Sequence, residues 1–125
     1  LINSVSCVNA PSQFAGIAAL DGPDDAIHEM MKKFTERRNL IHKGLNELPG
    51  VECSLPGGAF YAFPKVIETG MNGEEFCKKA MHEAGVAIVP GKAFGQTCND
   101  YVRFSFAASQ ENISQALENI KKMLS

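Results

Sequence analysis

Arg103 is the residue whose type and position most clearly suggest chemistry in this sequence. It lies inside the run Tyr101–Phe106, whose side chains would alternate between the two faces of a strand. The alternation places Arg103 on the face opposite three apolar residues: Val102, Phe104 and Phe106. A guanidinium is always charged, and its planar fork fits a carboxylate through paired hydrogen bonds. The pattern is consistent with an anion site, although an internal salt bridge or a solvated strand face is the commoner setting for such an arginine.

Two glycine-rich segments, Pro56–Tyr61 and Pro90–Gly95, are further candidates for ligand contact. The first either approaches a ligand closely or serves only as a hairpin turn. The second has the glycines of a phosphate-binding loop but lacks the G-x-x-x-x-G-K-[ST] pattern, and G-x-G-x-x-G occurs nowhere in the sequence. We expect its Lys92 to be an ordinary exposed amine and the pair Glu74–Glu75 to be helix-start charges.

The sequence has 4 cysteines, which are far apart and form no C-x-x-C pair: Cys7, Cys53, Cys77 and Cys98. We expect reduced and mostly buried thiols, as in a cytoplasmic protein. Cys77 and His82 are separated by a spacing that places them poorly on a common helix face, so we expect no metal site. No local pattern suggests a Ser/His/Asp or Cys/His catalytic set.

Helical spacing of apolar residues predicts helices over 11–20, 24–48 and 73–84, and a last helix that Ser109 caps. The helix over 24–48 would be about 36 Å long, which suits a connection between two bodies. We expect its Arg37 and Arg38 to lie on a solvated face.

Alternating or apolar runs predict strands over 51–55, 59–63, 86–89 and 101–106, the first two as a hairpin. The predicted fold class is α/β, in the form of an α+β-like small domain. It would have a small, mostly antiparallel sheet with helices packed on one side, preceded by the long connecting helix.

Composition limits the function classes. The chain has 125 residues and a formal net charge of −2, which fits one domain and argues against nucleic-acid or anionic-membrane partners. No apolar run approaches the ~18 residues of a membrane span, and Leu1–Val8 has no signal-peptide pattern. The chain begins with Leu rather than Met, which suggests a piece of a longer protein.

Six segments, taken together and in order, resemble class I and II aminotransferases, the pyridoxal-phosphate enzymes of fold type I: Asn9–Gln13, Phe34–Arg38, Leu48–Val51, Pro56–Tyr61, Val89–Gly95 and Val102–Ala107. The sequence is most similar to aspartate aminotransferases of the prokaryotic type. The resemblance covers the whole chain and implies roughly the last third of such an enzyme. Residues 1–23 would end the large domain, 24–48 would form the connecting helix, and 49–125 would form the C-terminal small domain.

The resemblance also implies an activity: transfer of an amino group between an amino acid and a 2-oxo acid, with pyridoxal 5′-phosphate as cofactor. Arg103 would bind the α-carboxylate of the substrate, and Phe94 would line the substrate side of the cleft. The whole enzyme would be a cytoplasmic homodimer. We assign no role to the region around Asn9.

One departure from the family is important. The Schiff-base lysine of these enzymes lies in an S-K-x-x-x-x-x-G-x-R type segment, and this sequence has no such segment. We therefore expect no catalytic and no cofactor-binding residue in this chain, and no activity from the chain alone. Two other readings stay open: the ligand-sensing body of a transcription regulator, and a binding module without catalysis. A full-length open reading frame would separate the three.

Overall fold

The computed structural model describes residues 7–125, so most of the segment in which we expect no signal peptide lies outside the description. The chain forms two compact units, which divide between Met30 and Met31. No helix of the described part is both long enough and apolar enough to cross a bilayer.

In the first unit, α1 spans Ala10–Asp21, close to the predicted 11–20. The side chain of Asn9 accepts a hydrogen bond from the backbone N–H of Ser12 at 3.0 Å, and Pro11 occupies the first turn. No residue of α1 is buried. Local capping therefore defines where this helix begins.

The long helix α2 spans Asp25–Asn46, within the predicted 24–48. In its C-terminal half, Ile41 and Leu45 are buried in the core of the second unit. The expectation of a solvated arginine pair is only partly correct, since both arginines are half-buried. Arg37 lies over the ring of Phe34, 5.4 Å from its centroid.

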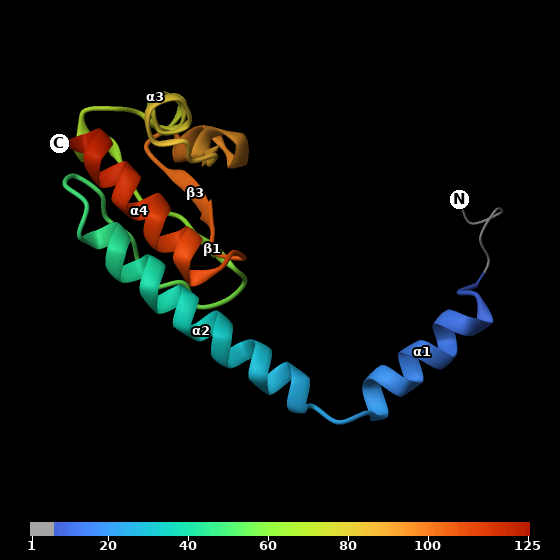
Figure 1. The fold of residues 1–125 in the computed structure, drawn as a ribbon. Coiled ribbons are helices and arrows are strands. Elements are labelled where there is room, and N and C mark those ends of the chain that lie inside the picture. The colour runs from blue at the N-terminus through green and yellow to red at the C-terminus, as the bar shows by residue number, and fades with distance from the viewer. Residues whose placement is uncertain (1–6) are drawn as a thin grey trace. The chain divides into compact units, whose positions relative to one another are not determined.

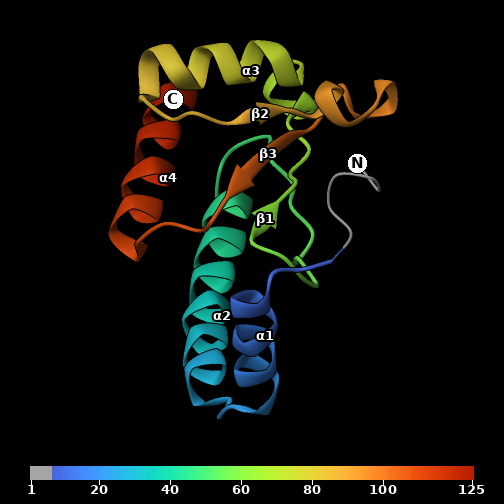
Figure 2. The same ribbon diagram turned by 90° about the vertical axis from the view of Figure 1, so that its right-hand side faces the viewer.

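The second unit contains a small antiparallel sheet, as predicted (Figure 2). Strand β3, Val102–Ser105, lies between β1, Tyr61–Ala62, and β2, Val89–Pro90. Tyr61 pairs with Ser105 across one side of β3, and Val89 pairs with Arg103 across the other.

The predicted strand over 51–55 and its hairpin are wrong. Only an isolated antiparallel bridge between Glu52 and Lys65 forms there. The cause is a competing partner, because the side chain of Asn46 binds both backbone groups of Cys53, at 3.0 Å to its N–H and 2.9 Å to its carbonyl. This segment is held against the end of α2, and Leu55 beyond it is exposed.

The predicted buried strand over 86–89 is also corrected. Strand β2 has two residues and is half-buried. It lies at an edge of the sheet, where it pairs with a strand on one side alone, and its Pro90 has no N–H for a further strand.

The predicted helix over 73–84 forms as α3, Gly73–Lys79, followed by a π-helical turn at Ala80–Ala84. It ends at Gly85, whose φ of 67° lies in the left-handed region that glycine adopts without strain. The side chain of Asn119 donates a hydrogen bond to the carbonyl of Ala84 at 3.0 Å and so gives a partner to a carbonyl at the end of this turn.

The last helix, α4, spans Gln110–Leu124, and Ser109 caps it through the N–H of Asn112 at 3.2 Å. Figure 1 shows α3 and α4 beside the strands of the second unit. Buried side chains of the helices, the sheet and their connections form one core, and the largest that are fully buried are Phe76, Phe106, Leu45, Ile120, Val66, Val102 and Pro64. The predicted fold class is therefore confirmed, including the apolar face of β3 turned toward helices.

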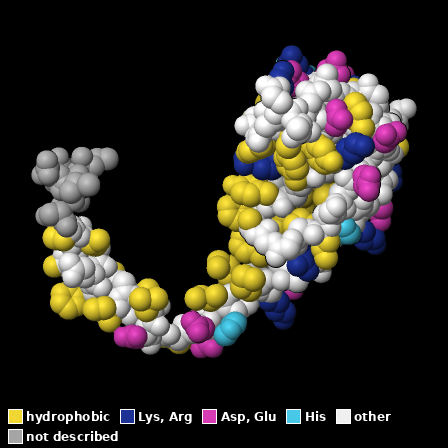
Figure 3. Space-filling view, turned by 180° about the vertical axis from the view of Figure 1, so that it is seen from behind, with side chains coloured by type: hydrophobic (Ala, Val, Ile, Leu, Met, Phe, Trp, Pro, Cys, Tyr) yellow, Lys and Arg dark blue, Asp and Glu magenta, His cyan; other side chains and the backbone are white. Residues whose placement is uncertain are grey.

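Several large apolar side chains of the second unit remain exposed: Met31, Leu55, Phe60, Phe63, Met81 and Phe94. Apolar side chains gather on the face that Figure 3 presents. Exposed apolar side chains that gather on one face are typical of a surface that another body covers.

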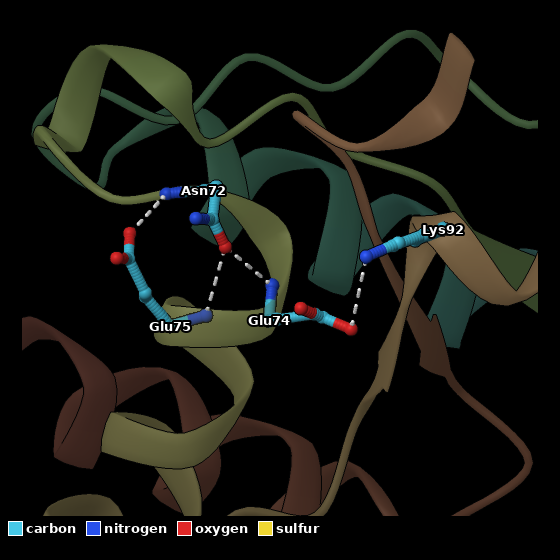
Figure 4. A network of polar contacts seen from close by, with 4 residues as sticks. All are labelled: Asn72, Glu74, Glu75 and Lys92. Carbon is cyan, nitrogen blue, oxygen red and sulfur yellow. Dashed lines mark hydrogen bonds and ion pairs between the residues drawn. The ribbon is translucent and has the colours of Figure 1, made fainter. Parts of the chain in front are cut away.

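The N-terminus of α3 carries a capping box, which Figure 4 shows. The side chain of Asn72 accepts from the N–H groups of Glu74 and Glu75 at 3.0 and 3.1 Å, and the Glu75 carboxylate accepts the Asn72 N–H at 2.9 Å. Asn72→Ala is expected to lower the free energy of unfolding by about 1 kcal/mol, read from a urea denaturation midpoint. Asn112→Ala, on α4, is the control and should cause no loss.

Candidate functional site

Arg103 lies on the face of β3 that turns away from the core, and its side chain is half-buried. The central carbon of its guanidinium lies over two aromatic rings, 4.3 Å from the centroid of Tyr61 and 4.6 Å from that of Phe94. Within residues 7–125, no carboxylate lies within ion-pair distance of Arg103, and its side chain makes no hydrogen bond. The N–H donors of this guanidinium are therefore available.

The sheet topology explains why these three residues meet. Tyr61 belongs to β1, on one side of β3, and its backbone pairs with Ser105. Phe94 ends a 3-10 turn, Gly91–Phe94, that follows β2 on the other side. The N–H of Gly91 donates to the carbonyl of Tyr101 at 2.7 Å, which ties this turn to the start of β3. Each side of the central strand thus supplies one ring.

More aromatic rings extend the cluster. Phe63 stacks on Tyr101 at 5.3 Å with an interplanar angle of 6°, and its ring meets that of Phe94 at 5.9 Å and 82°. Such pairs stabilise one another beyond their buried area. They brace Phe94, whose own side chain is 49% exposed.

The structure brings together the two residues named from the sequence, Arg103 and Phe94. Sequence reasoning missed Tyr61. The signal was present, because Tyr61 lies in the aromatic-rich strand predicted over 59–63, but only the register Tyr61–Ser105 shows that its ring reaches the arginine.

Lys92 is exposed, as expected. Its Nζ also lies 3.7 Å from a carboxylate oxygen of Glu74 on α3, and Figure 4 draws this pair. The pair is solvent-exposed and therefore contributes little stability. It does direct the amine of Lys92 toward α3.

The two buried cysteines provide no reactive thiolate. All four cysteines are free; Cys53 and Cys77 are buried, Cys98 is half-buried, and Cys7 is exposed. Burial, with the charge of Glu74, raises the pKa of Cys77 to about 11, and burial also raises the pKa of Cys53. Neither buried thiol is a thiolate near neutral pH. No group of three or more potential metal ligands occurs in the described part of the chain.

A hollow of about 330 Å³ lies between α2 and α4, away from this site. Its walls come from the two helices and from Glu47 and Leu48, and none of its lining residues belongs to the sheet. It is therefore separate from Arg103.

These features define an α+β domain with a small antiparallel sheet, whose central strand carries an arginine on the face turned away from the core. The guanidinium lies over two aromatic rings and has no anionic partner in residues 7–125. The family profile described as "Aminotransferase class I and II" matches residues 1–120. The chain belongs to the class I and II aminotransferase family.

Sequence and structure comparisons with known aminotransferases support this family assignment. The chain is 41% identical to an aspartate aminotransferase of Pyrococcus horikoshii over 114 residues, 90% of this chain and 29% of that protein. It is 42% identical to aromatic-amino-acid aminotransferase 2 of Thermococcus litoralis over 99 residues, 79% of this chain and 25% of that protein. The structure of an alanine aminotransferase from Pyrococcus furiosus superimposes with a TM-score of 0.88 at 42% identity, covering 94% of this chain and 30% of that one. The chain thus spans between a quarter and a third of the length of these relatives.

The described residues do not fit a pyridoxal phosphate site of their own. Such a site needs a lysine amine beside the cofactor aldehyde and donors for its phosphate. No lysine in residues 7–125 is buried, and four of them pair with surface glutamates: Lys43, Lys79, Lys92 and Lys122. The N–H groups of Gly91 and Gly95 are already bonded to backbone carbonyls, at 2.7 and 3.2 Å.

Proposed function

We propose that this chain is the C-terminal part of a pyridoxal-phosphate-dependent aminotransferase and that Arg103 binds the α-carboxylate of its substrate. The observation that carries the proposal is the guanidinium of Arg103, which lies over two rings and meets no carboxylate within residues 7–125. Charge-assisted, bidentate hydrogen bonds to a carboxylate would satisfy its donors. Phe94, over the same guanidinium, would line the substrate side of the cleft.

The domain assignment belongs to the same proposal. Residues 1–23 would end the large domain, 24–48 would form the connecting helix, and 49–125 the small domain. The exposed apolar side chains of the second unit support it, because such side chains are suited to burial against a further domain. The cofactor would then be held by parts of the enzyme outside this chain, in a cytoplasmic homodimer.

Among possible substrates we propose aspartate, paired with a 2-oxo acid. Two proteins that are similar to this chain, from Pyrococcus horikoshii and Rhizobium meliloti, are named aspartate aminotransferases and support this choice. Other similar proteins are named for aromatic amino acids or alanine. Aminotransfer to 2-oxoglutarate by the full-length enzyme, measured with aspartate, alanine and phenylalanine, tests this choice. A higher kcat/KM for either of the other two would replace aspartate, and no transfer from any of the three would refute the enzymatic function.

The chain by itself is expected to form no lasting adduct with pyridoxal phosphate, because no described lysine lies in an enclosed site. The purified chain would be mixed with the cofactor, dialysed, and scanned for visible absorbance. The full-length enzyme serves as the positive control. A cofactor band that survives dialysis of this chain would contradict the expectation.

A further inference from the structure

We propose that Tyr61 is a positioning residue, whose ring holds the guanidinium of Arg103 in place for the incoming carboxylate. This inference rests on the proposed function of Arg103 and adds a second residue to that site. Tyr61 would act through Arg103 and need not touch the substrate itself.

The contact geometry supports this role. The guanidinium carbon lies 4.3 Å from the Tyr61 ring centroid, well within the range of cation–π attraction. A ring face attracts the cation without accepting the N–H hydrogen bonds that a carboxylate accepts. Tyr61 can therefore fix the guanidinium while leaving its donors available for substrate.

Tyr61 is better fixed than the second ring over Arg103. Its backbone pairs with β3 opposite Ser105, two residues beyond Arg103 on the same strand. The ring of Phe60 packs against it at 4.5 Å. Phe94, in contrast, ends a short turn and is 49% exposed. Tyr61 thus links the arginine to the frame of the sheet.

A long arginine side chain has many rotamers, and binding a carboxylate to two of its donors requires one orientation. A ring that holds this orientation in advance lowers the ordering cost of binding. Loss of the ring face should therefore weaken recognition of the carboxylate in particular, while the remaining contacts of a substrate stay as they were.

The test uses the full-length enzyme with Tyr61→Leu and Tyr61→Phe. Tyr61→Leu should lower kcat/KM for the amino acid substrate about five- to thirtyfold, the range that a partly desolvated cation–π contact corresponds to. Tyr61→Phe keeps the ring face and should stay within about twofold of the wild type. Inhibition by two ligands that differ only in the carboxylate, an amino acid and its decarboxylated amine, supplies the specific readout: the Leu variant should lose affinity for the first alone.

Two further variants test whether the effect comes from rings that lie over the guanidinium. Phe94→Leu, at an exposed ring, should show a smaller loss of the same kind and remains informative if Tyr61→Leu folds poorly. Phe63→Leu measures the indirect contribution of the cluster, because its ring braces Phe94 but does not lie over the guanidinium; its loss should be smaller than that of Phe94→Leu.

Three results would overturn the inference: equal loss in Tyr61→Phe and Tyr61→Leu, equal loss of affinity for the acid and the amine, or an undiminished effect of Tyr61→Leu in an Arg103→Leu background. Its failure is distinguishable from failure of the proposed function. If Arg103→Leu itself leaves carboxylate recognition intact, the proposed function fails; if only the Tyr61 results fail, Arg103 keeps its role.

Discussion

Arg103→Lys in the full-length enzyme is expected to lower kcat/KM for amino acid substrates by about a hundredfold or more. Lysine keeps the positive charge, but its compact ammonium cannot supply two parallel donors to one carboxylate. It also loses the flat contact that the guanidinium makes with Tyr61 and Phe94. A substrate held by one flexible contact would present its reacting bond in the wrong orientation, and small displacements of a reacting group reduce rates steeply.

Steady-state kinetics with the wild type and the variant measure this effect. Protein stability should change little, because Arg103 makes no ion pair or side-chain hydrogen bond with the rest of residues 7–125. Arg38→Lys is the matched control, since Arg38 lies on α2 and donates to the side chain of Asn39 at 3.0 Å. Its kinetics should equal those of the wild type. If Arg103→Lys behaves like Arg38→Lys, Arg103 does not bind the substrate.

Gly91→Ala is expected to destabilise the domain by about 1–3 kcal/mol or more and to reduce activity as well. Gly91 is buried, and a Cβ built there would meet the carbonyl oxygens of Cys98 and Tyr101, the latter at 2.6 Å. Both obstacles are backbone atoms, which cannot rotate away as a flexible side chain would. The turn that carries Phe94 would have to move away from the start of β3, so the ring over Arg103 would be displaced.

Thermal or urea denaturation would measure the stability change, and KM for the amino acid would report on the site. Gly58→Ala provides the comparison, because a Cβ there finds nothing within 4 Å and the backbone is not in the left-handed region. We expect its stability to stay within about 0.5 kcal/mol of the wild type. Equal stability of the two alanine variants would show that the 91–95 turn tolerates a side chain.

Local signals in the sequence predicted most of the helices and the central strand. Capping residues such as Asn72 and Ser109 set the starts of α3 and α4, because their side chains bind N–H groups only a few residues away. Gly85 ends the helical segment at the predicted position. The alternation around Arg103 correctly placed Val102 and Phe104 in the core.

The strand over 51–55 failed because a partner outside the segment decided the outcome. The strand expected over 51–55 does not form, because the side-chain amide of Asn46 binds the backbone groups of Cys53 that a neighbouring strand would have bound. The ion pair of Lys92 with Glu74, which joins a turn to a helix, was not predicted either. Neither partner can be read from the periodicity of the segment itself.

By itself, the sequence determined the helices, the central strand, the apolar face of the sheet and the choice of Arg103, because these depend on residue type and on spacing along the chain. Phe94 was named only through the resemblance to aminotransferases. Only the tertiary structure decided that Tyr61 lies under Arg103 and that no carboxylate of residues 7–125 reaches it. Strand order and register settle such contacts, since they bring together residues separated by tens of positions in the sequence.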